Sequence, residues 1–329
     1  MNKTYWLIAV VAVALLLFGF VNANGDLGSF GITIMSGLFQ AMLLFLVASG
    51  LSIVFGLMDV LNFAQGSFFM IGAYVGYAVH HSPQLISVLP NGDVRFVVSL
   101  LAAVLVGGVL GVFFERALLR PLYARPIFQI VLTFGVALVI GELIKVVWTP
   151  TPYSWTAMFT ARSGFFTVFE QQFSTYRLFV IGAGFLLIIG IGLLLQRTRI
   201  GIIIRAGVED SQMVEALGIN VRAVFTLVFT LGCAVAALGG AVAAPFLGAS
   251  TGLANQFLLS AIAIVVLGGL GSYGGTAIAS ILVGVAVAVI QDWSASPGVN
   301  APVWASLTPM LLLVLILLIR PSGLFGKEN

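Results

Sequence analysis

The sequence predicts an all-α, polytopic integral membrane protein, a helical bundle with about ten transmembrane segments, some of them broken by glycine. The first observation is composition: 60% of the 329 residues are hydrophobic and only 8% are charged, whereas soluble domains carry about 25% charged residues. The second is that apolar runs of roughly spanning length recur along the whole chain. We therefore treat residues 1–329 as one transmembrane domain.

The first apolar run, Tyr5 to Val21, is near the short end for a membrane span and follows Lys3. Residues 1–22 are either an extra N-terminal span, acting as a signal anchor, or a signal peptide, because Val21-Asn22-Ala23 would serve as a cleavage site. The sequence does not decide whether residues 1–23 are removed.

A polar interruption follows the second span, Gly31 to Gly56, and precedes the third, Phe68 to Val79. It contains Asp59, Asn62, Gln65 and Ser67. Irregular backbone at membrane depth is tolerated only where protein or a water-filled cavity surrounds it. The interruption is therefore either part of a transport path, with Tyr74 beyond it, or a polar turn at the cytoplasmic surface.

The fourth and fifth spans are Phe96 to Phe114 and Ile127 to Trp148. Glu142 and Lys145 lie three residues apart in the fifth. Because Trp148 places them near the outer interface, where lysine can extend to water, we favour a structural pair over an ion relay. The following loop, Thr149 to Tyr176, is the longest on the outside and is expected to receive an extracytoplasmic partner.

Residues 196–222, between the sixth span (Arg177 to Leu195) and the seventh (Ala223 to Leu247), form the most charged stretch of the chain. Such a segment must lie in water. It predicts one short surface helix that docks on another protein. The residues expected to couple it to that protein are Arg205, Glu209, Asp210, Met213, Ala216, Leu217 and Gly218. Of these, the two acidic residues suit a helix N-terminus and Gly218 suits a left-handed C-cap.

The last apolar runs are Phe257 to Leu267, Thr276 to Ile290 and Val303 to Ile319. The first two are joined by Gly268 to Gly275, which contains the G-x-G-x-x-G spacing of dinucleotide-binding loops. That motif requires a preceding strand, and here both flanks predict helices. We interpret the joint as a second glycine break, with Gly271 and Ser272 as candidate path residues.

Ten basic residues fall on one predicted side of the membrane and three on the other. The ten are Lys3, Arg116, Arg120, Arg125, Arg197, Arg199, Arg205, Arg222, Arg320 and Lys327, and the three are Arg95, Arg162 and Arg177. Positive charge marks the cytoplasmic side. Both termini and the charged stretch are therefore predicted to be cytoplasmic.

The motifs of common enzymes are absent from the sequence. It has no phosphate-binding GxxxxGK[ST] loop, no HExxH and no GxSxG, and its single cysteine, Cys233, cannot form an internal disulfide. We predict no catalytic activity, no metal or other cofactor, and no nucleic-acid partner. A transport subunit powered by another protein fits best.

Several motifs together resemble the branched-chain amino acid ABC permeases of the LivH type. They include Asn62-Phe-Ala-Gln-Gly66 followed by Met70-Ile-Gly-Ala-Tyr74, and Glu209-Asp210 followed by Ala216-Leu-Gly-Ile219. Further matches are Glu115-Arg116 with Arg120-Pro121, the glycine joint, and the closing Pro321-Ser-Gly-Leu-Phe-Gly326. The likeness runs from about residue 32 to the C-terminus.

The resemblance implies a bacterial inner-membrane importer in which this chain pairs with a second, LivM-type permease. Two cytoplasmic ATP-binding subunits and a periplasmic substrate-binding protein complete the assembly. The substrate path would use Asn62, Gln65, Ser67, Tyr74, Gly271 and Ser272. Gln65 stands where the family usually has histidine, so a urea or amide permease of the same family remains an alternative, as does an ion-coupled secondary carrier. Whether the permease pair is homo- or heterodimeric is left open.

Overall fold

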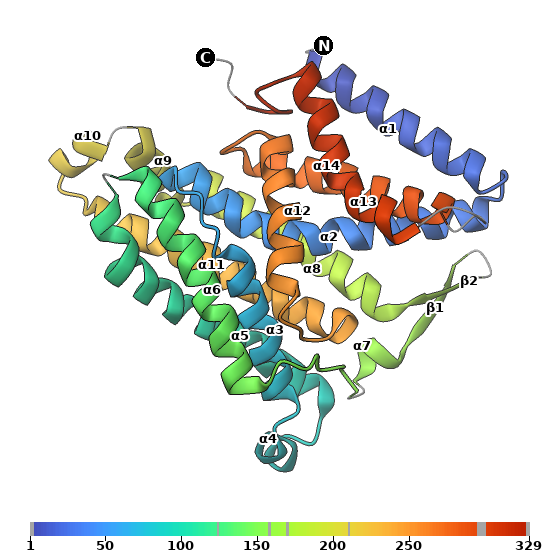
Figure 1. Cartoon of the computed structure of the whole chain (residues 1–329), viewed down its shortest axis with the longest axis horizontal. Coiled ribbons are helices and arrows are strands. Elements are labelled where there is room, and N and C mark those ends of the chain that lie inside the picture. The colour runs from blue at the N-terminus through green and yellow to red at the C-terminus, as the bar shows by residue number, and fades with distance from the viewer. Residues whose placement is uncertain are drawn as a thin grey trace.

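The computed structural model describes residues 3–123, 125–156, 159–168, 171–209, 211–294 and 301–326. These residues form a bundle of helices crossing at varied angles, with one small β-hairpin at the edge (Figure 1). The all-α prediction is therefore confirmed.

Ten apolar helices correspond to the ten predicted segments. They are α1 (Lys3–Asn22), α2 (Leu27–Met58), α3 (Gln65–His80), α5 (Gly92–Phe114), α6 (Pro126–Trp148), α8 (Thr175–Arg197), α11 (Val221–Leu247), α12 (Leu253–Gly268), α13 (Tyr273–Ser294) and α14 (Ala301–Ile319). Among the described residues, six helices are by themselves long and apolar enough to cross a membrane, namely α2, α5, α6, α8, α11 and α13. The apolar parts of α1, α12 and α14 are shorter.

Short elements connect these helices. They are α4 (Pro83–Val88), the π-helical turn η1 (Glu115–Leu119), the 3-10 turn η2 (Arg120–Leu122), α7 (Thr160–Ser163), α9 (Arg199–Glu209) and α10 (Ser211–Ala216). Strands β1 (Phe165–Val168) and β2 (Gln171–Ser174) pair antiparallel with Phe166 opposite Phe173. Together with α7, this hairpin lies in the long loop between α6 and α8.

Helices α2 and α11 form the centre of the bundle and cross where two glycines meet. A Cβ atom on Gly50 would lie 2.5 Å from the carbonyl oxygen of Gly232, and one on Gly232 would lie 2.9 Å from that of Gly50. In the most apolar stretches, 83% of α2 and 78% of α11 are buried, against 28% of α5 and 11% of α6. The peripheral helices therefore present most of their apolar surface outward.

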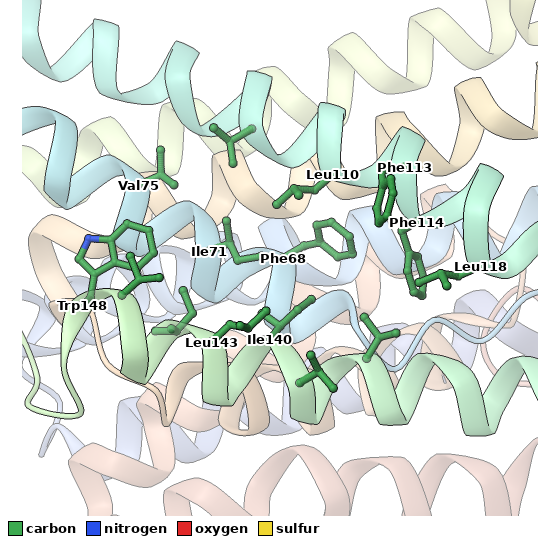
Figure 2. Close-up of a pocket in the computed structure, with 15 residues that line it drawn as sticks. Phe68, Ile71, Val75, Leu110, Phe113, Phe114, Leu118, Ile140, Leu143 and Trp148 are labelled. Atoms are coloured by element: carbon green, nitrogen blue, oxygen red, sulfur yellow. The ribbon is translucent and has the colours of Figure 1, made fainter.

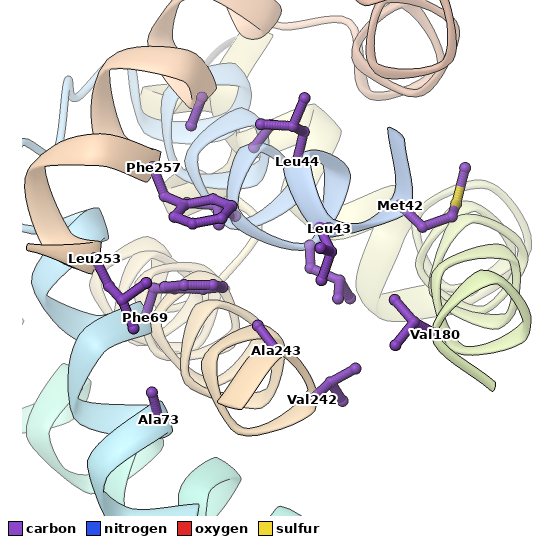
Figure 3. Packing of buried hydrophobic residues seen from close by; sticks show 14 of the residues in the cluster. Met42, Leu43, Leu44, Phe69, Ala73, Val180, Val242, Ala243, Leu253 and Phe257 are labelled. Carbon is purple, nitrogen blue, oxygen red and sulfur yellow. The ribbon is translucent and has the colours of Figure 1, made fainter. Parts of the chain in front are cut away.

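Helix α3 packs along α11 through small residues. A side chain on Gly72 would overlap the backbone of Ala237, and one on Gly240 would overlap the carbonyl oxygen of Phe69. Helix α12 then joins α3 through the stacked rings of Phe69 and Phe257, whose centroids are 4.8 Å apart (Figure 3). These contacts hold α3 against α11 and α12. Helix α3 begins directly after the polar interruption that follows α2.

Several helix ends lie close together at one end of the bundle. The end of α2 meets the α12–α13 joint, because Gly56 lies against the backbone of Gly271. The end of α5 meets the start of α11, since Arg120 Nη2 donates to Thr226 Oγ1 over 2.7 Å. The tail after α14 returns to the same joint, where Leu324 N donates to the Leu267 carbonyl over 2.9 Å.

Candidate functional site

The first break is an irregular segment between α2 and α3. Helix α2 ends at Met58, and its C-cap residue Asp59 has a left-handed backbone angle φ of 53°. The chain then continues without helical structure to Ala64, and α3 begins at Gln65. The side chain of Asn62 helps to start this helix, since its Oδ1 accepts a hydrogen bond from Ala64 N over 3.1 Å.

Asn62 and Gln65 are fully buried and bonded to each other. Asn62 Nδ2 donates to Gln65 Oε1 over 3.0 Å, and Gln65 Nε2 donates to the carbonyl oxygen of Gly232 over 2.9 Å. A side chain on Gly50 would overlap Gln65 Nε2. The Gln65 amide therefore occupies the space, here called the Gln65 notch, that Gly50 and Gly232 leave where α2 and α11 cross. It also provides hydrogen-bond partners for the buried Asn62 amide and the buried Gly232 carbonyl, which would otherwise be unpaired.

The other two predicted path residues on α3 are also buried. Ser67 Oγ lies 3.4 Å from the carbonyl oxygen of Ala137, in α6. The ring of Tyr74 lies against Trp148 and Tyr153, with centroid distances of 5.6 and 6.2 Å. The Tyr74 hydroxyl has no hydrogen-bond partner among the described residues.

The second break, between α12 and α13, borders an open hollow of about 660 Å³. Gly269 and Gly271 have φ angles of 98° and 83°, a conformation that glycine adopts without steric cost. Ser272 Oγ accepts a hydrogen bond from Gly275 N over 3.1 Å and so caps α13. The sequence motif thus lies between two helices, as predicted, and Gly271 and Ser272 line the hollow together with the chain's closing segment.

The two breaks lie beside the same helix at different depths. Gln65 adjoins Gly50, whereas Gly271 adjoins Gly56. These two glycines are six positions apart, which is about 9 Å along the axis of α2. The structure therefore separates Asn62 and Gln65 from Gly271 and Ser272. Tyr74 stands apart from both, nine positions and about 13 Å along α3 from Gln65.

A buried cluster around Glu115 was not predicted as a functional feature. Its carboxylate is completely buried and accepts hydrogen bonds from Tyr123 at 2.6 Å, from Arg120 at 3.2 Å and from Thr226 at 2.7 Å. Burial and the bond to Glu115 raise the pKa of Tyr123, so the phenol stays protonated and donates. The sequence signal was an acidic residue at the end of a span, five positions before an arginine.

We expect Glu115→Ala to destabilise the protein by about 3 kcal/mol, because it leaves the Arg120 guanidinium without its partner. This value is at the lower end of the range for breaking a buried ion pair, because the Arg120 side chain is 33% exposed and keeps part of its hydration. Thermal unfolding in detergent measures this change. Glu142→Ala is the matched control, because the Glu142 side chain, paired with Lys145 at 2.6 Å, is 73% exposed and should contribute less than about 1 kcal/mol. Equal losses in the two variants would contradict this prediction.

The charged stretch contains two helices, which corrects the prediction of a single one. Glu209 is the last residue of α9, not part of the first turn of the next helix, and Asp210 lies outside the described residues. The burial pattern of α9 explains the difference: Gly201, Ile204 and Gly207, spaced three residues apart, are buried, whereas Arg205 is exposed. This spacing makes residues 199–209 an amphipathic helix of their own.

Helix α10 has the expected exposed face and C-cap. Met213 and Leu217 are 62% and 70% exposed, whereas Val214 is buried against the bundle. Gly218 has a φ of 80°. Its N–H donates to the Glu215 carbonyl over 2.9 Å, and Ile219 N donates to the Val214 carbonyl over 3.3 Å. Arg205 and Ala216 are also exposed, so most of the described coupling candidates lie on the outer surface.

Comparison with known proteins gives consistent matches over most of the chain. A family model described as "Branched-chain amino acid transport system / permease component" matches residues 33–319, a range that begins after α1. No solved structure matches significantly.

Three relatives illustrate the likeness. The high-affinity branched-chain amino acid transport system permease protein LivH of Escherichia coli K12 is 24% identical over 86% of this chain and 91% of its own length. The corresponding protein BraD of Pseudomonas aeruginosa is 28% identical over 86% and 92%. A probable branched-chain amino acid transport permease protein LivH of Methanocaldococcus jannaschii is 28% identical over 87% and 89%.

Proposed function

Because the chain belongs to the family of branched-chain amino acid transport system permease components, we propose that it is the membrane-spanning subunit of an ATP-driven importer of branched-chain amino acids. The observation that carries this proposal is the family match over residues 33–319, which includes α3 to α14 and most of α2. The names of the relatives supply the proposed substrate class.

The proposed assembly contains two cytoplasmic ATP-binding subunits, a LivM-type permease partner and a periplasmic substrate-binding protein. The sequence has no phosphate-binding loop of its own, so other chains must hydrolyse ATP. The exposed face of α10 offers a docking surface for an ATP-binding subunit. The α6–α8 loop, with α7 and the hairpin, offers one for the substrate-binding protein.

We further propose that the face carrying α9 and α10 is cytoplasmic, in a bacterial inner membrane, and that both termini lie there. The Arg120–Thr226 bond places the basic α5–α6 loop beside the start of α11, next to the charged stretch. At the opposite end of the bundle, Asn22 Nδ2 donates to Asp292 Oδ2 over 3.0 Å, so α1 begins on the basic side. The positive-inside rule then assigns that side to the cytoplasm.

A direct route connects the docking surface with the first break. Helix α10 ends at Gly218, and Asn220 then caps α11 by accepting a hydrogen bond from Ala223 N over 3.1 Å. Along α11, Gly232 accepts the bond from Gln65. A displacement of α10 would therefore move α11 relative to α2 and disturb the Gln65 notch. We propose that ATP-driven motion opens the path in this way.

The predicted path residues remain our proposal for substrate contact. A zwitterion with an apolar side chain requires a few hydrogen-bond partners and apolar walls, and the hollow beside Gly271 and Ser272 offers both. In the described conformation the Gln65 amide is committed to Asn62 and Gly232. It becomes available to substrate only when α2 and α11 separate.

We expect Ser272→Ala and Gln65→Ala to reduce uptake at normal expression, with the larger loss for Gln65→Ala. That substitution also leaves the buried Gly232 carbonyl and Asn62 amide without their partner, at a cost of about 1–3 kcal/mol. Gln65→His, which restores the usual residue of the family, tests whether an imidazole can fill the same notch. Full uptake by the two alanine variants would remove these residues from the path.

The proposed function is tested with the complete complex in vesicles. ATP together with the binding protein should drive accumulation of leucine, isoleucine and valine in preference to urea. Preferred accumulation of urea would support the alternative substrate class suggested by Gln65. Uptake by this chain alone, driven by an ion gradient, would replace the importer with a secondary carrier.

A further inference from the structure

A long apolar groove runs along the outside of the bundle between α5 and α6, with α3 as its floor (Figure 2). It extends from Trp148 at one end to Leu118 at the other and has a volume of about 540 Å³. All of its lining side chains are aliphatic or aromatic. The groove exists because α6 contacts the rest of the bundle mainly through α3, the α5–α6 turns and few other residues.

A second, shallower groove of about 440 Å³ adjoins the first one. Phe113 lines both grooves, and Val109 and Val112 continue the wall of the second one. Arg116 also lines this second groove and is exposed. The two apolar grooves therefore meet at Phe113, and the Arg116 guanidinium belongs to the lining of the second one.

The chemistry of the main groove excludes the transported zwitterion, because aliphatic and aromatic walls offer nothing to its ammonium and carboxylate groups. Its size argues against a helix of a partner subunit. A helix about 10–12 Å wide rises 1.5 Å per residue, so a volume of this size encloses only about three to five residues. A flexible methylene chain needs no polar partner and follows a narrow slot.

Exposed charge at the Leu118 end of the groove is positive. Arg116 and Arg125 are exposed there, whereas the nearby carboxylate of Glu115 is buried and bonded to Arg120, Tyr123 and Thr226. On α6 near the Trp148 end, Glu142 is paired with Lys145. An anionic headgroup is therefore favoured at the Leu118 end.

We propose that these two grooves hold the acyl chains of one anionic diacyl phospholipid, with its phosphate at Arg116. The lipid comes from the leaflet on the Arg116 side. One chain fills the gap between α5 and α6, and the other lies along Val109 and Val112. The lipid ties the weakly packed α6 to the bundle. This site is independent of the proposed substrate and of the ATP-binding subunits.

The test is native mass spectrometry of the full-length chain released from micelles containing equal amounts of phosphatidylglycerol and phosphatidylcholine. The unmodified chain should retain one phosphatidylglycerol. Leu143→Trp, which fills the groove, should lose most of it. Leu138→Trp is the matched control, because Leu138 and Leu143 are 59% and 55% exposed on the same helix and only Leu143 lines the groove.

The headgroup is tested separately with Arg116→Gln. Its preference for phosphatidylglycerol over phosphatidylcholine should fall about fivefold, which corresponds to the roughly 1 kcal/mol expected for one basic residue near anionic lipid. Arg222→Gln, another exposed arginine of the same face, should retain the preference. Circular dichroism and gel filtration check that each variant is folded. Val139→Phe is a second variant that fills the main groove, with a smaller side chain than tryptophan.

Two results would overturn the proposal. One is that folded Leu143→Trp and Val139→Phe both retain phosphatidylglycerol as the unmodified chain does. The other is that a photoreactive residue at position 143 of the assembled transporter forms adducts with a protein subunit. Adducts with the mass of an anionic phospholipid support the site.

Discussion

Gly218→Pro is expected to abolish ATP-driven uptake by the assembled transporter while the chain still inserts in the membrane. Gly218 has a φ of 80°, whereas proline fixes φ near −65° and has no N–H to donate. The substitution therefore removes the hydrogen bond to Glu215 and redirects the chain between α10 and α11. Leucine uptake and ATP hydrolysis, measured together in vesicles, report whether the coupling has been lost.

Gly218→Asn is the control for this prediction. Apart from its two chain neighbours, no atom of the described residues lies within 4 Å of the position that a Cβ would occupy at Gly218, so the backbone angle is the main constraint on the residue. Asparagine tolerates the left-handed conformation better than most residues, and we expect uptake close to normal. Normal coupled uptake by Gly218→Pro would show that α10 is not the contact with the ATP-binding subunits.

Gly240→Ala is expected to produce the largest loss of stability for the smallest chemical change. A Cβ at Gly240 would overlap the Phe69 carbonyl oxygen, and main-chain atoms cannot move aside as a flexible side chain can. Helices α3 and α11 must then separate, at a cost of about 3 kcal/mol or more. Thermal unfolding in detergent and the yield of folded protein measure the effect.

Gly190→Ala should change stability in the opposite direction. Gly190 lies within α8, and a Cβ there would meet, beyond the backbone of its own helix, no atom of the described residues within 4 Å. Replacing a helical glycine by alanine in open space stabilises the helix by about 0.5–1 kcal/mol. If both variants shift the unfolding temperature equally, the close contact between α3 and α11 does not govern stability.

The sequence alone located the helices and their interruptions well. Apolar runs placed all ten apolar helices, because a chain in lipid must satisfy its backbone within each helix. Charge at Asp59 and glycine at 268–275 marked the two breaks. The expected left-handed angle at Gly218 is confirmed. The sequence does not predict the division of residues 199–216 into two helices, because the acidic pair at 209–210 is typical of a helix start.

The candidate site was predicted less completely, for a reason that the Gln65 side chain illustrates. Its polar character signalled a special position, but its partner, Gly232, is 167 residues away. No local pattern connects these two residues. Similarly, Glu115 was identified as part of a motif, whereas its bond to Thr226, 111 residues away, appears only in the folded chain.

The sequence by itself determined that this protein is a helical membrane permease, where its helices lie, and where they are interrupted. The tertiary structure decided which apolar faces pack inward and which remain on the surface. Lipid and protein interior are equally apolar, so hydrophobicity cannot distinguish α11, buried over 78% of its apolar stretch, from α6, buried over 11%. A helix is buried where glycines let its backbone approach that of another helix closely. Such contacts join residues that are far apart in the chain.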